Sequence, residues 1–311
     1  MEEKKILKKL KDIFLEKRGY LINIPKKNTP VILLFSGGLD SSLLWFILTK
    51  KYNLIVYPVF FYQNYLDCFF MKIKIKKIEK FIKNNCPKYF RKTKFIKITN
   101  LFSFSKIDKK KIMTDYFNII PNIISINLDN KNKIKKNYIS LIANPGRLWL
   151  FSFYAHQFTY QIRYQIEKDI NTIFIGLVPD DSKTLRESTL THIYALTLNF
   201  CLFLGNFKWQ LIAPLDKKSN FYYSKKDLLN FNNRYDFPTF KTWSCTKSLF
   251  IHCGKCYNCI KRQEVFLSLN IPDKTIYLSK ISKKLSSFLK FKIKKSVFFI
   301  KKMISLIKKV L

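Results

Sequence analysis

The most constraining feature of the sequence is a glycine- and serine-rich turn, SGGLDSS at residues 36–42, that separates two apolar segments. Residues 31–35 form a short uncharged run without alternation, which is typical of a buried strand, and residues 43–48 follow with a helical apolar pattern. A turn from strand to helix directs several backbone N–H groups and the positive end of the helix toward one point. The pattern therefore predicts an α/β fold with an anion-binding turn.

The residue types in this turn suit a phosphate or pyrophosphate group. Gly37 and Gly38 let the backbone approach an anion and adopt positive φ angles. Asp40 would repel phosphate directly, but its carboxylate can bind the Mg²⁺ that bridges phosphate oxygens. No lysine follows the second glycine as the P-loop signature requires, which argues against a kinase or GTPase. Hydroxyl donors are available from three serines: Ser36, Ser41 and Ser42. The alternative is an ordinary turn in which Asp40 or Ser41 caps a helix.

Strand and helix patterns alternate along the rest of the chain. This alternation predicts a parallel β-sheet with helices on both faces and right-handed crossovers, a Rossmann-like arrangement. Residues 100–138 show weak periodicity, and we interpret them as an insertion or mobile flap. Further strands are expected at 54–61, 95–98, 172–175 and 209–213, and further helices at 3–18, 147–168 and 188–204.

Four cysteines near the C-terminal end have the spacing of a metal site. They follow the pattern Cys-x7-Cys-x2-Cys-x2-Cys, and four thiolates make a closed tetrahedral Zn²⁺ site with a structural role. Neighbouring basic side chains, including Lys255 and Arg262, are expected to favour the thiolate form. His252 lies beside the cluster, but four cysteines leave it no ligand role. The predicted zinc ligands are Cys245, Cys253, Cys256 and Cys259.

The charge balance is strongly basic, with 58 Lys and Arg against 20 Asp and Glu, a net charge of +38. Such a charge favours nucleic acid, anionic membrane surfaces or anionic small substrates. The abundance of Lys, Ile, Asn and Phe is equally what compositional bias of the gene would produce. Residues 275–311 contain eleven lysines and no acid. This basic amphipathic tail either caps the core or contacts nucleic acid or an anionic surface.

The sequence contains no apolar stretch long enough for a membrane-spanning helix and no signal-peptide pattern at its N-terminus. We therefore expect a protein of the reducing cytoplasm. Its segments are expected to be an N-terminal helical extension at 1–28, an α/β domain at 29–240, a zinc-binding segment at 241–270 and the tail at 271–311. A homodimer is expected only because symmetric dimers are common.

Taken together, SGGLDSS and the later TWSC and HCGKCYNCIKR segments resemble the 7-cyano-7-deazaguanine synthase family of the ATP-pyrophosphatase (PP-loop) superfamily. The resemblance covers residues 30–268. Between the end motifs, Pro145-Gly146-Arg147 resembles the family's Pro-Gly-Arg segment, and Gly176 with Asp181 resembles its Gly-x4-Asp strand end. Pro214 with Lys225 resembles the stretch in which a lysine opens a helix.

The resemblance implies an ATP-dependent ligase that activates 7-carboxy-7-deazaguanine. ATP would adenylate the carboxylate, ammonia would displace AMP to give an amide, and a second ATP would dehydrate the amide to the nitrile. The implied catalytic residues are Asp40, Ser41, Arg147 and Lys225. The implied nucleotide-binding residues are Phe35, Ser36, Gly37, Gly38, Leu39, Asp40, Ser41, Ser42, Gly176 and Asp181. ATP, Mg²⁺ and Zn²⁺ are the implied cofactors.

The chain departs from the family pattern where the substrate base would be recognised. The family's Phe-Asp-Tyr-Gly-Gln run is replaced by residues 60–64 (FFYQN), and Leu148 stands where an Asn usually follows the Arg. Thr184-Leu185-Arg186 replaces the family's Tyr-Pro-Asp run. Two alternatives therefore remain open from the sequence. A divergent phage-defence enzyme would couple the deazaguanine carboxylate to an amine on a protein or nucleic acid, and a zinc-stabilised nucleic-acid-binding protein would have an inactive turn.

Overall fold

The computed structural model describes residues 2–62, 65–98, 146–180, 188–248 and 250–281. The chain divides into two compact units, Met1–Trp243 and Ser244–Leu311, which are considered one at a time. The expected flap at residues 100–138 lies outside the described residues, as does most of the expected basic tail. No helix in the described ranges is long and apolar enough to cross a membrane.

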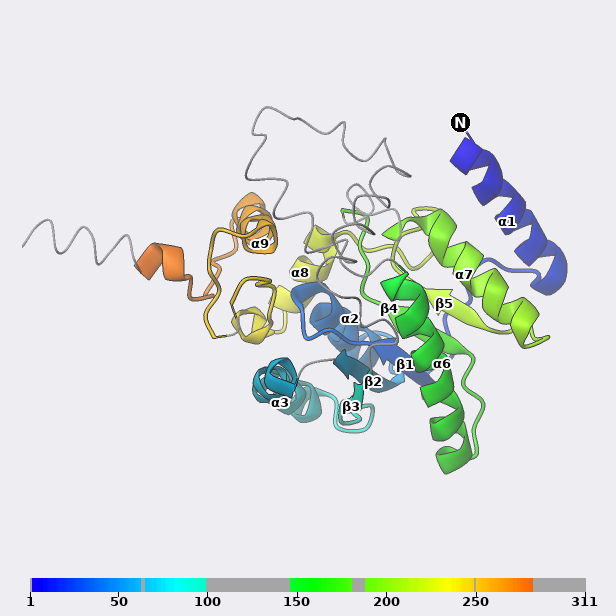
Figure 1. Ribbon diagram of the computed structural model, residues 1–311, viewed down its shortest axis with the longest axis horizontal. Helices are drawn as coiled ribbons and strands as arrows, with labels where there is room; N and C mark the ends of the chain where they lie inside the picture. Colours follow the sequence, from blue (N-terminus) through cyan, green and yellow to red (C-terminus); the bar gives the residue numbers. More distant parts are fainter. Residues whose placement is uncertain (1, 63–64, 99–145, 181–187, 249, 282–311) are drawn as a thin grey trace, which may run out of the picture. The chain divides into compact units, whose positions relative to one another are not determined.

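Five parallel strands form the sheet of the first unit, in the order β3-β2-β1-β4-β5 (Figure 1). This sheet confirms the predicted parallel α/β class. Each expected strand is present, with ends that shift by at most one residue. Their bounds are β1 Pro30–Leu34, β2 Ile55–Tyr62, β3 Lys94–Lys97, β4 Thr172–Ile175 and β5 Gln210–Ile212.

The strand order places a topological switch point between β1 and β4. From β1 the chain builds outward through β2 to β3, and then returns to place β4 on the other side of β1. In open parallel sheets, ligands bind in the crevice at this point, outside the carboxyl ends of the strands.

Helices cover both faces of the sheet (Figure 1). On one face, α1 (Glu2–Arg18), α6 (Arg147–Ile166) and α7 (Leu190–Phe203) share an apolar cluster with Ile32 and Leu34 of β1. Side chains alternate along a strand, so the fully buried Val31 and Leu33 face the other side. That side is covered by α2 (Leu39–Lys50), α3 (Tyr65–Asn85) and α8 (Lys225–Asn233).

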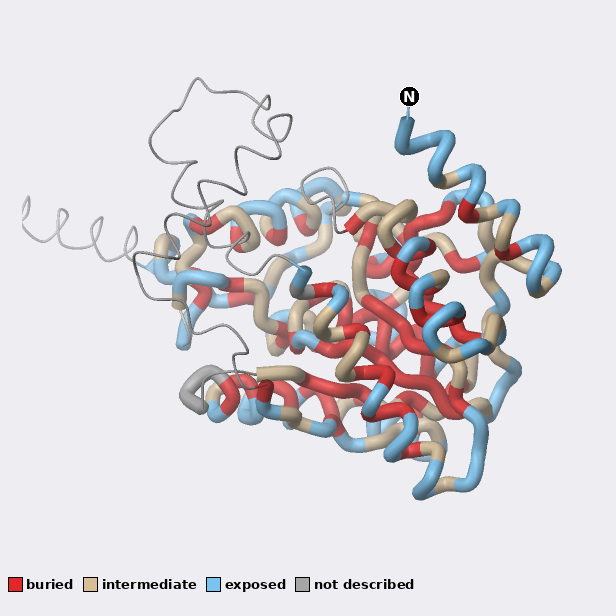
Figure 2. Tube along the Cα trace, turned by 45° about the vertical axis from the view of Figure 1, so that its right-hand side comes forward, coloured by how far each residue is buried: buried red, intermediate tan, exposed pale blue. Residues whose placement is uncertain are grey.

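Aromatic rings join the helices of this second face. The Phe46 ring of α2 lies 5.3 Å from the Phe81 ring of α3 and 6.3 Å from the Phe231 ring of α8. Strands β1, β4 and β5 and helix α2 are buried along most of their length, and Figure 2 shows buried residues gathered along the centre of the sheet. Helix α2 is buried on all sides, as is typical of a core helix. The surrounding core therefore holds the turn at its N-terminus in place.

Helix α1 is the expected amphipathic N-terminal helix, and it packs within the first unit. Phe14 is fully buried, and the Lys11 ammonium lies 2.7 Å from the Asp216 carboxylate. The Arg18 guanidinium donates to the carbonyl of Trp209 at 2.8 Å, just before β5. These contacts tie the helix to the far end of the sheet by both apolar and charged groups.

His156 on α6 is a buried histidine held among aromatic rings. It is 1% exposed, lies 4.4 Å from the Trp209 ring centroid and stacks on Phe200. Neither ring nitrogen has a hydrogen-bond partner among the described residues. Burial, and secondly the charge of Arg163, lower the pKa of His156 to about 4. The native protein therefore holds a neutral imidazole at pH 7.

We expect His156→Phe to reduce the acid sensitivity of the fold. The unfolded imidazole gains a proton near its ordinary pKa of about 6.5, whereas the native one gains it only near 4. Native stability is therefore lost as the pH falls below about 6.5, by on the order of 3 kcal/mol at pH 4. Thermal unfolding of both proteins at pH 7.5 and pH 5 should show a smaller decrease in Tm for the variant. Equal decreases would contradict this role.

Candidate functional site

The turn after β1 has the geometry of an anion-binding strand-to-helix turn. Gly37 adopts a φ of 69°, a conformation that favours glycine, and Gly38 is the N-cap of α2. The Ser36 and Ser41 hydroxyls lie 3.0 Å apart, and the Ser42 hydroxyl donates to the Gly38 carbonyl at 2.6 Å. The first N–H groups of α2 have no intrahelical acceptor, so they are available to an anion.

The side chains of Phe35 and Leu39 lie in the core and not at the anion-binding turn. Both are nearly fully buried, and the Phe35 ring lies 5.0 Å from the Trp45 ring of α2. The Phe35 N–H donates to the Val59 carbonyl of β2. These two residues anchor the turn in the core, so any contact they make with a nucleotide would come from the backbone.

Asp40 and Lys225 come together although 185 positions separate them in the sequence. The Lys225 ammonium lies 3.2 Å from Oδ2 of Asp40, and the two side chains are 16% and 21% exposed. Ser224 caps α8 in a reciprocal capping box with Asp227, which sets the direction of the first turn from which Lys225 projects. The structure thus places two of the sequence-predicted residues in one partly buried ion pair.

The second carboxylate oxygen of Asp40 has the environment of a cation ligand. Oδ1 is buried and has no hydrogen-bond partner within the described ranges. A buried oxygen that carries part of a negative charge is costly unless a donor or a cation satisfies it. Magnesium takes one or two carboxylates together with phosphate oxygens. The donor set at the turn therefore fits this ion.

Gly176 brings the end of β4 against the start of α2. A Cβ at this position would lie 2.7 Å from the Ser41 Cα and 2.9 Å from the Ser41 nitrogen, both backbone atoms. Real Cβ atoms do not approach backbone this closely, so only glycine permits the contact. Gly176 therefore sets the position of Ser41 across the switch point.

We expect Gly176→Ala to reduce turnover more than stability. The methyl group would push the first turn of α2 away from β4, and small displacements of positioning groups reduce rates by about a hundredfold. Gly205→Ala is the control, because Gly205 has a φ of 62° but no atom within 4 Å of its Cβ position. Steady-state release of AMP, the activity that the sequence resemblance implies, and thermal unfolding should be measured for both. Unchanged turnover in Gly176→Ala would count against this positioning role.

The other predicted residues are only partly described. Arg147 begins α6 directly after Gly146, whose φ is 74°, but its side chain is not among the described atoms. Asp181 lies outside the described residues. The structure therefore leaves the roles of these two residues as predictions from the resemblance.

Trp243 is a residue at the turn that the sequence analysis did not single out. Its N–H donates to the Gly37 carbonyl at 2.9 Å, and its own carbonyl lies 3.6 Å from the position of a Cβ on Gly38. The Lys74 ammonium of α3 lies over the Trp243 ring, 2.9 Å from the ring centroid. In the sequence, the only indication of a role for Trp243 was its place in the TWSC segment. Trp243 thus contacts the turn at Gly37 and Gly38, whereas Gly176 contacts it at Ser41.

The four predicted zinc ligands converge within the second unit. Their sulfur atoms all lie within 4.8 Å of one another, and three of the four residues are buried. Tetrahedral Zn²⁺ with bonds of about 2.3 Å needs sulfurs roughly 3.8 Å apart. Cys256 is the N-cap of α9 (Tyr257–Ser268), and Cys259 lies in its first turn. The arrangement therefore fits a closed four-thiolate metal site.

Backbone N–H groups supply the positive environment of the cluster. Burial opposes the thiolate of Cys256, but hydrogen bonds from Thr246, Cys259 and Cys253 outweigh it and lower its pKa to about 6. The Cys256 N–H donates to the Cys253 sulfur at 3.2 Å. We expected neighbouring basic side chains to favour the thiolate form, but two of them pair with carboxylates. Arg262 pairs with Asp273 at 3.7 Å and Lys261 with Glu264 at 2.7 Å.

His252 has a structural role beside the cluster. Its Nε2 accepts a hydrogen bond from the Ser244 N–H at 3.2 Å, and the residue is 4% exposed. The Leu278 N–H donates to the His252 carbonyl, which joins this strand-like segment to residues near 277. His252 thus supports the loop that carries the ligands, as expected of a residue outside the metal site.

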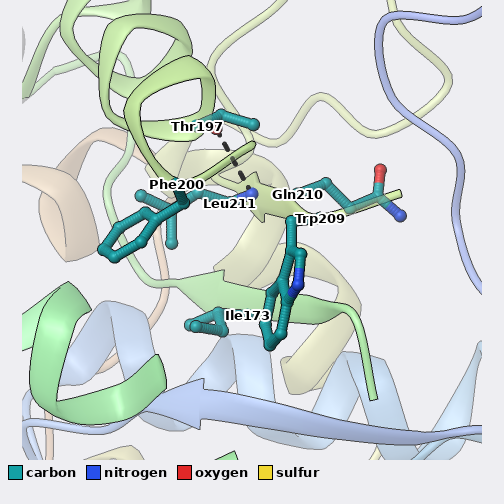
Figure 3. A pocket seen from close by; sticks show the side chains of 6 residues that line it. All are labelled: Ile173, Thr197, Phe200, Trp209, Gln210 and Leu211. Atoms are coloured by element: carbon teal, nitrogen blue, oxygen red, sulfur yellow. Dashed lines mark hydrogen bonds between the residues drawn. The ribbon is translucent and has the colours of Figure 1, made fainter. Parts of the chain in front are cut away.

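A small cavity between α7 and strands β4 and β5 is a packing defect. Its lining is shown in Figure 3 and comprises Ile173, Thr197, Phe200, Trp209, Gln210 and Leu211. The Leu211 N–H donates to the Thr197 hydroxyl at 3.4 Å. The volume of about 10 Å³ is at the lower limit of the space that one water molecule needs. The turn after β1 therefore remains the candidate site.

Comparisons with known proteins show which family the chain resembles. A family model described as "Queuosine biosynthesis protein QueC" matches residues 30–270. Proteins named 7-cyano-7-deazaguanine synthase from Paracoccus denitrificans and Rhizobium meliloti are each 43% identical to the chain over 54 residues. These matches cover 17% of this chain and 23% of each relative, so the chain spans about a quarter of the curated relatives' length.

A solved structure of a U34-tRNA thiolase, NcsA from Methanococcus maripaludis with its [4Fe-4S] cluster, was also matched. The two proteins are 14% identical, and the match covers 85% of this chain and 80% of the thiolase with a TM-score of 0.34. At that score we draw nothing from the likeness.

Proposed function

The chain belongs to the QueC family, whose model matches residues 30–270, and from this premise we propose that it is an ATP-dependent ligase of the 7-cyano-7-deazaguanine synthase type. Its substrate would be 7-carboxy-7-deazaguanine, and its nitrogen source would be ammonia. The observation that carries the proposal is the convergence of Asp40 and Lys225 at the N-terminus of α2. The two side chains place a carboxylate and a cation at the ligand-binding edge of a doubly wound sheet.

The first step is adenylation of the substrate carboxylate. A carboxylate oxygen attacks the α-phosphorus of ATP, and pyrophosphate leaves with the electron pair of the broken P–O bond. The N–H groups at the start of α2 and the hydroxyls of Ser36 and Ser41 would hold the departing pyrophosphate. Fixed donors directed at developing charge are a large contribution to catalysis. Lys225, and Arg147 by resemblance, would add positive charge.

The next steps replace oxygen by nitrogen. Ammonia attacks the activated carbonyl, AMP leaves, and the amide forms after a proton is lost. Activation of the amide oxygen by a second ATP, followed by loss of AMP and two protons from nitrogen, gives the nitrile. Both activations use the same donors of the turn, since pyrophosphate is the leaving group in each.

Asp40 would hold magnesium through its unpartnered Oδ1. When bound, the ion neutralises phosphate charge and helps pyrophosphate to leave. The ion pair with Lys225 orients the carboxylate through Oδ2, which keeps Oδ1 directed for this role. Gly176 and Trp243 hold the turn in place, and Asp181 is proposed as a further nucleotide contact by resemblance alone.

We assign zinc to the four-cysteine cluster as a structural metal. Four sulfur ligands close the coordination shell and leave no position for substrate, which favours a role in folding. The assignment is tested by the metal content of the purified protein. One equivalent of zinc is expected, whereas iron with the absorbance of a cluster would contradict the assignment.

The decisive experiment is a turnover assay with defined substrates. Zinc-loaded protein is incubated with magnesium, ATP, 7-carboxy-7-deazaguanine and ammonium, and AMP release and the mass of the base are followed. We expect AMP that depends on the base, together with the amide or nitrile. AMP without either product would point to a different amine acceptor, and no base-dependent AMP would contradict the proposed activity.

A further inference from the structure

The outer side of α3 carries a line of lysines that the proposed activity does not use. Lys72, Lys76, Lys80 and Lys83 are all exposed and follow the i, i+4, i+8, i+11 spacing of one helix face. We call these four residues the α3 lysine stripe. At 1.5 Å per residue the stripe is about 16 Å long, which equals about five nucleotide steps of 3.4 Å.

Further lysines lie beside this stripe, on the edge strand β3 and just before it. The buried Glu79 carboxylate of α3 accepts a hydrogen bond from the Thr93 N–H at 2.7 Å, which places residues 92–94 against the middle of the helix. Lys92 and Lys94 are exposed there. Lysines on an edge strand also prevent aggregation, so these two residues alone would need no ligand. The helix residues have no such explanation.

The stripe is not neutralised by acidic side chains. Between residues 72 and 97 the sequence contains eleven basic residues and one acid, Glu79, which is buried and already bonded to Thr93. In the part of the chain that the structure describes, no carboxylate forms an ion pair with the four stripe lysines. Like charges at i, i+4 spacing destabilise a helix, and an anionic partner would relieve that repulsion.

Helix α1 differs from α3 in the placement of its acidic residues. Helix α1 is also rich in lysine, but its acidic residues are interspersed: Glu2, Glu3, Asp12 and Glu16. Its Lys11 pairs with Asp216 and its Lys17 with Glu16. A lysine-rich helix of this protein can therefore carry interspersed acids, whereas the single acid of α3 between residues 72 and 85, Glu79, is buried.

The surface around the stripe fits a nucleic acid better than a membrane. Among the described side chains of α3, the large exposed apolar residues are Phe69 and Ile73. Two residues do not make the contiguous apolar face with which an amphipathic helix enters a bilayer. An exposed aromatic ring beside basic side chains is instead the composition of surfaces that stack on bases and contact phosphates.

We propose that the α3 lysine stripe is a binding surface for the phosphate backbone of a nucleic acid. The four ammonium groups contact phosphates without reading sequence, and Phe69 provides a ring at one end on which a base can stack. Such contacts release counterions, so binding weakens steeply with salt. This inference is independent of the adenylation activity.

The test compares two variants of the full-length protein that lose the same charge. In the first, the four stripe lysines become Gln, and in the second Lys4, Lys5, Lys8 and Lys9 of α1 become Gln. Gln retains helix propensity, and circular dichroism checks that both variants fold. Binding to a fluorescent 20-nucleotide oligo-uridine RNA is measured by anisotropy between 50 and 200 mM salt, concentrations chosen to span the steep part of the dependence.

We expect the stripe variant to bind RNA about tenfold or more weakly at 50 mM salt and to reduce the slope of log affinity against log salt by roughly 3. The α1 variant should change much less. Equal losses in both variants would show that binding follows net charge alone and would overturn the proposal, as would no measurable RNA binding by the unmodified protein. Flotation with vesicles containing phosphatidylglycerol is measured in parallel. Loss of vesicle binding with unchanged RNA binding would assign the stripe to membranes and also overturn the proposal.

Discussion

Asp40→Asn is expected to reduce base-dependent AMP release by about a hundredfold or more, with little change in the fold. The substitution removes the negative charge that we propose holds magnesium at Oδ1 and that pairs with Lys225 through Oδ2. Loss of one preorganised electrostatic group at such sites lowers turnover by about this amount. Initial rates of AMP formation at saturating ATP, and again across magnesium concentrations, measure the effect.

The control is Asp236→Asn, which makes the same chemical change at an exposed position of the first unit. Asp236 has a φ of 52°, a conformation that Asn also accepts, so stability should be retained. Activity should remain at the wild-type level in this control. An Asp40→Asn protein that retains most of its turnover would remove the carboxylate from the mechanism.

Lys225 tests whether the ion pair acts as a unit. Lys225→Gln should also reduce turnover, and the double variant with Asp40→Asn should lose less than the product of the two single effects. Independent effects would show that Lys225 acts on substrate without depending on Asp40. This comparison therefore distinguishes an orienting role of the pair from two separate roles.

Cys259→Ser is expected to abolish stoichiometric metal binding and to destabilise the second unit. Cys259 is fully buried, and its loss leaves three sulfur ligands within the cluster. Structural zinc sites contribute apparent binding free energies on the order of 10 kcal/mol, which is coupled to folding. Metal content by mass spectrometry and thermal unfolding with and without a chelator measure the two consequences.

Cys86→Ser is the matched control for this prediction. Cys86 is also buried, but it lies at the end of α3 and outside the cluster. Burial raises the pKa of the Cys86 thiol, as is common for a structural cysteine. This variant should retain the metal content of the unmodified protein and its response to the chelator. A Cys259→Ser protein with full zinc content and unchanged unfolding would refute a structural metal.

Much of the architecture could be predicted from local patterns. The apolar runs at 31–35 and 172–175 are strands because each is short, uncharged and bounded by turn residues, and the helix at 147–168 is observed as α6. The cysteine spacing predicted a cluster because a short loop keeps its ends close whatever the rest of the chain does. Helices α3 and α9 were not among the expected helices.

The contacts that make the site depended on tertiary structure. Neither Asp40 nor Lys225 carries a local signal for the other, and the 2.7 Å approach of a Cβ on Gly176 to Ser41 depends on β4 pairing with β1. The hydrogen bond from Trp243 to Gly37 likewise depends on where residues 239–243 return to the sheet. Composition could not locate the α3 lysine stripe either, because only burial showed that Glu79 is turned inward.

The sequence by itself thus determined the strands, most of the helices, the turn and the metal-ligand spacing, because these depend on residues close together in the chain. The tertiary structure decided which of those residues meet. Strand order is selected by the burial of both faces of the sheet at once, a sum over contacts between distant segments that no local pattern contains. For this reason the pairing of Asp40 with Lys225 became visible only in the folded chain.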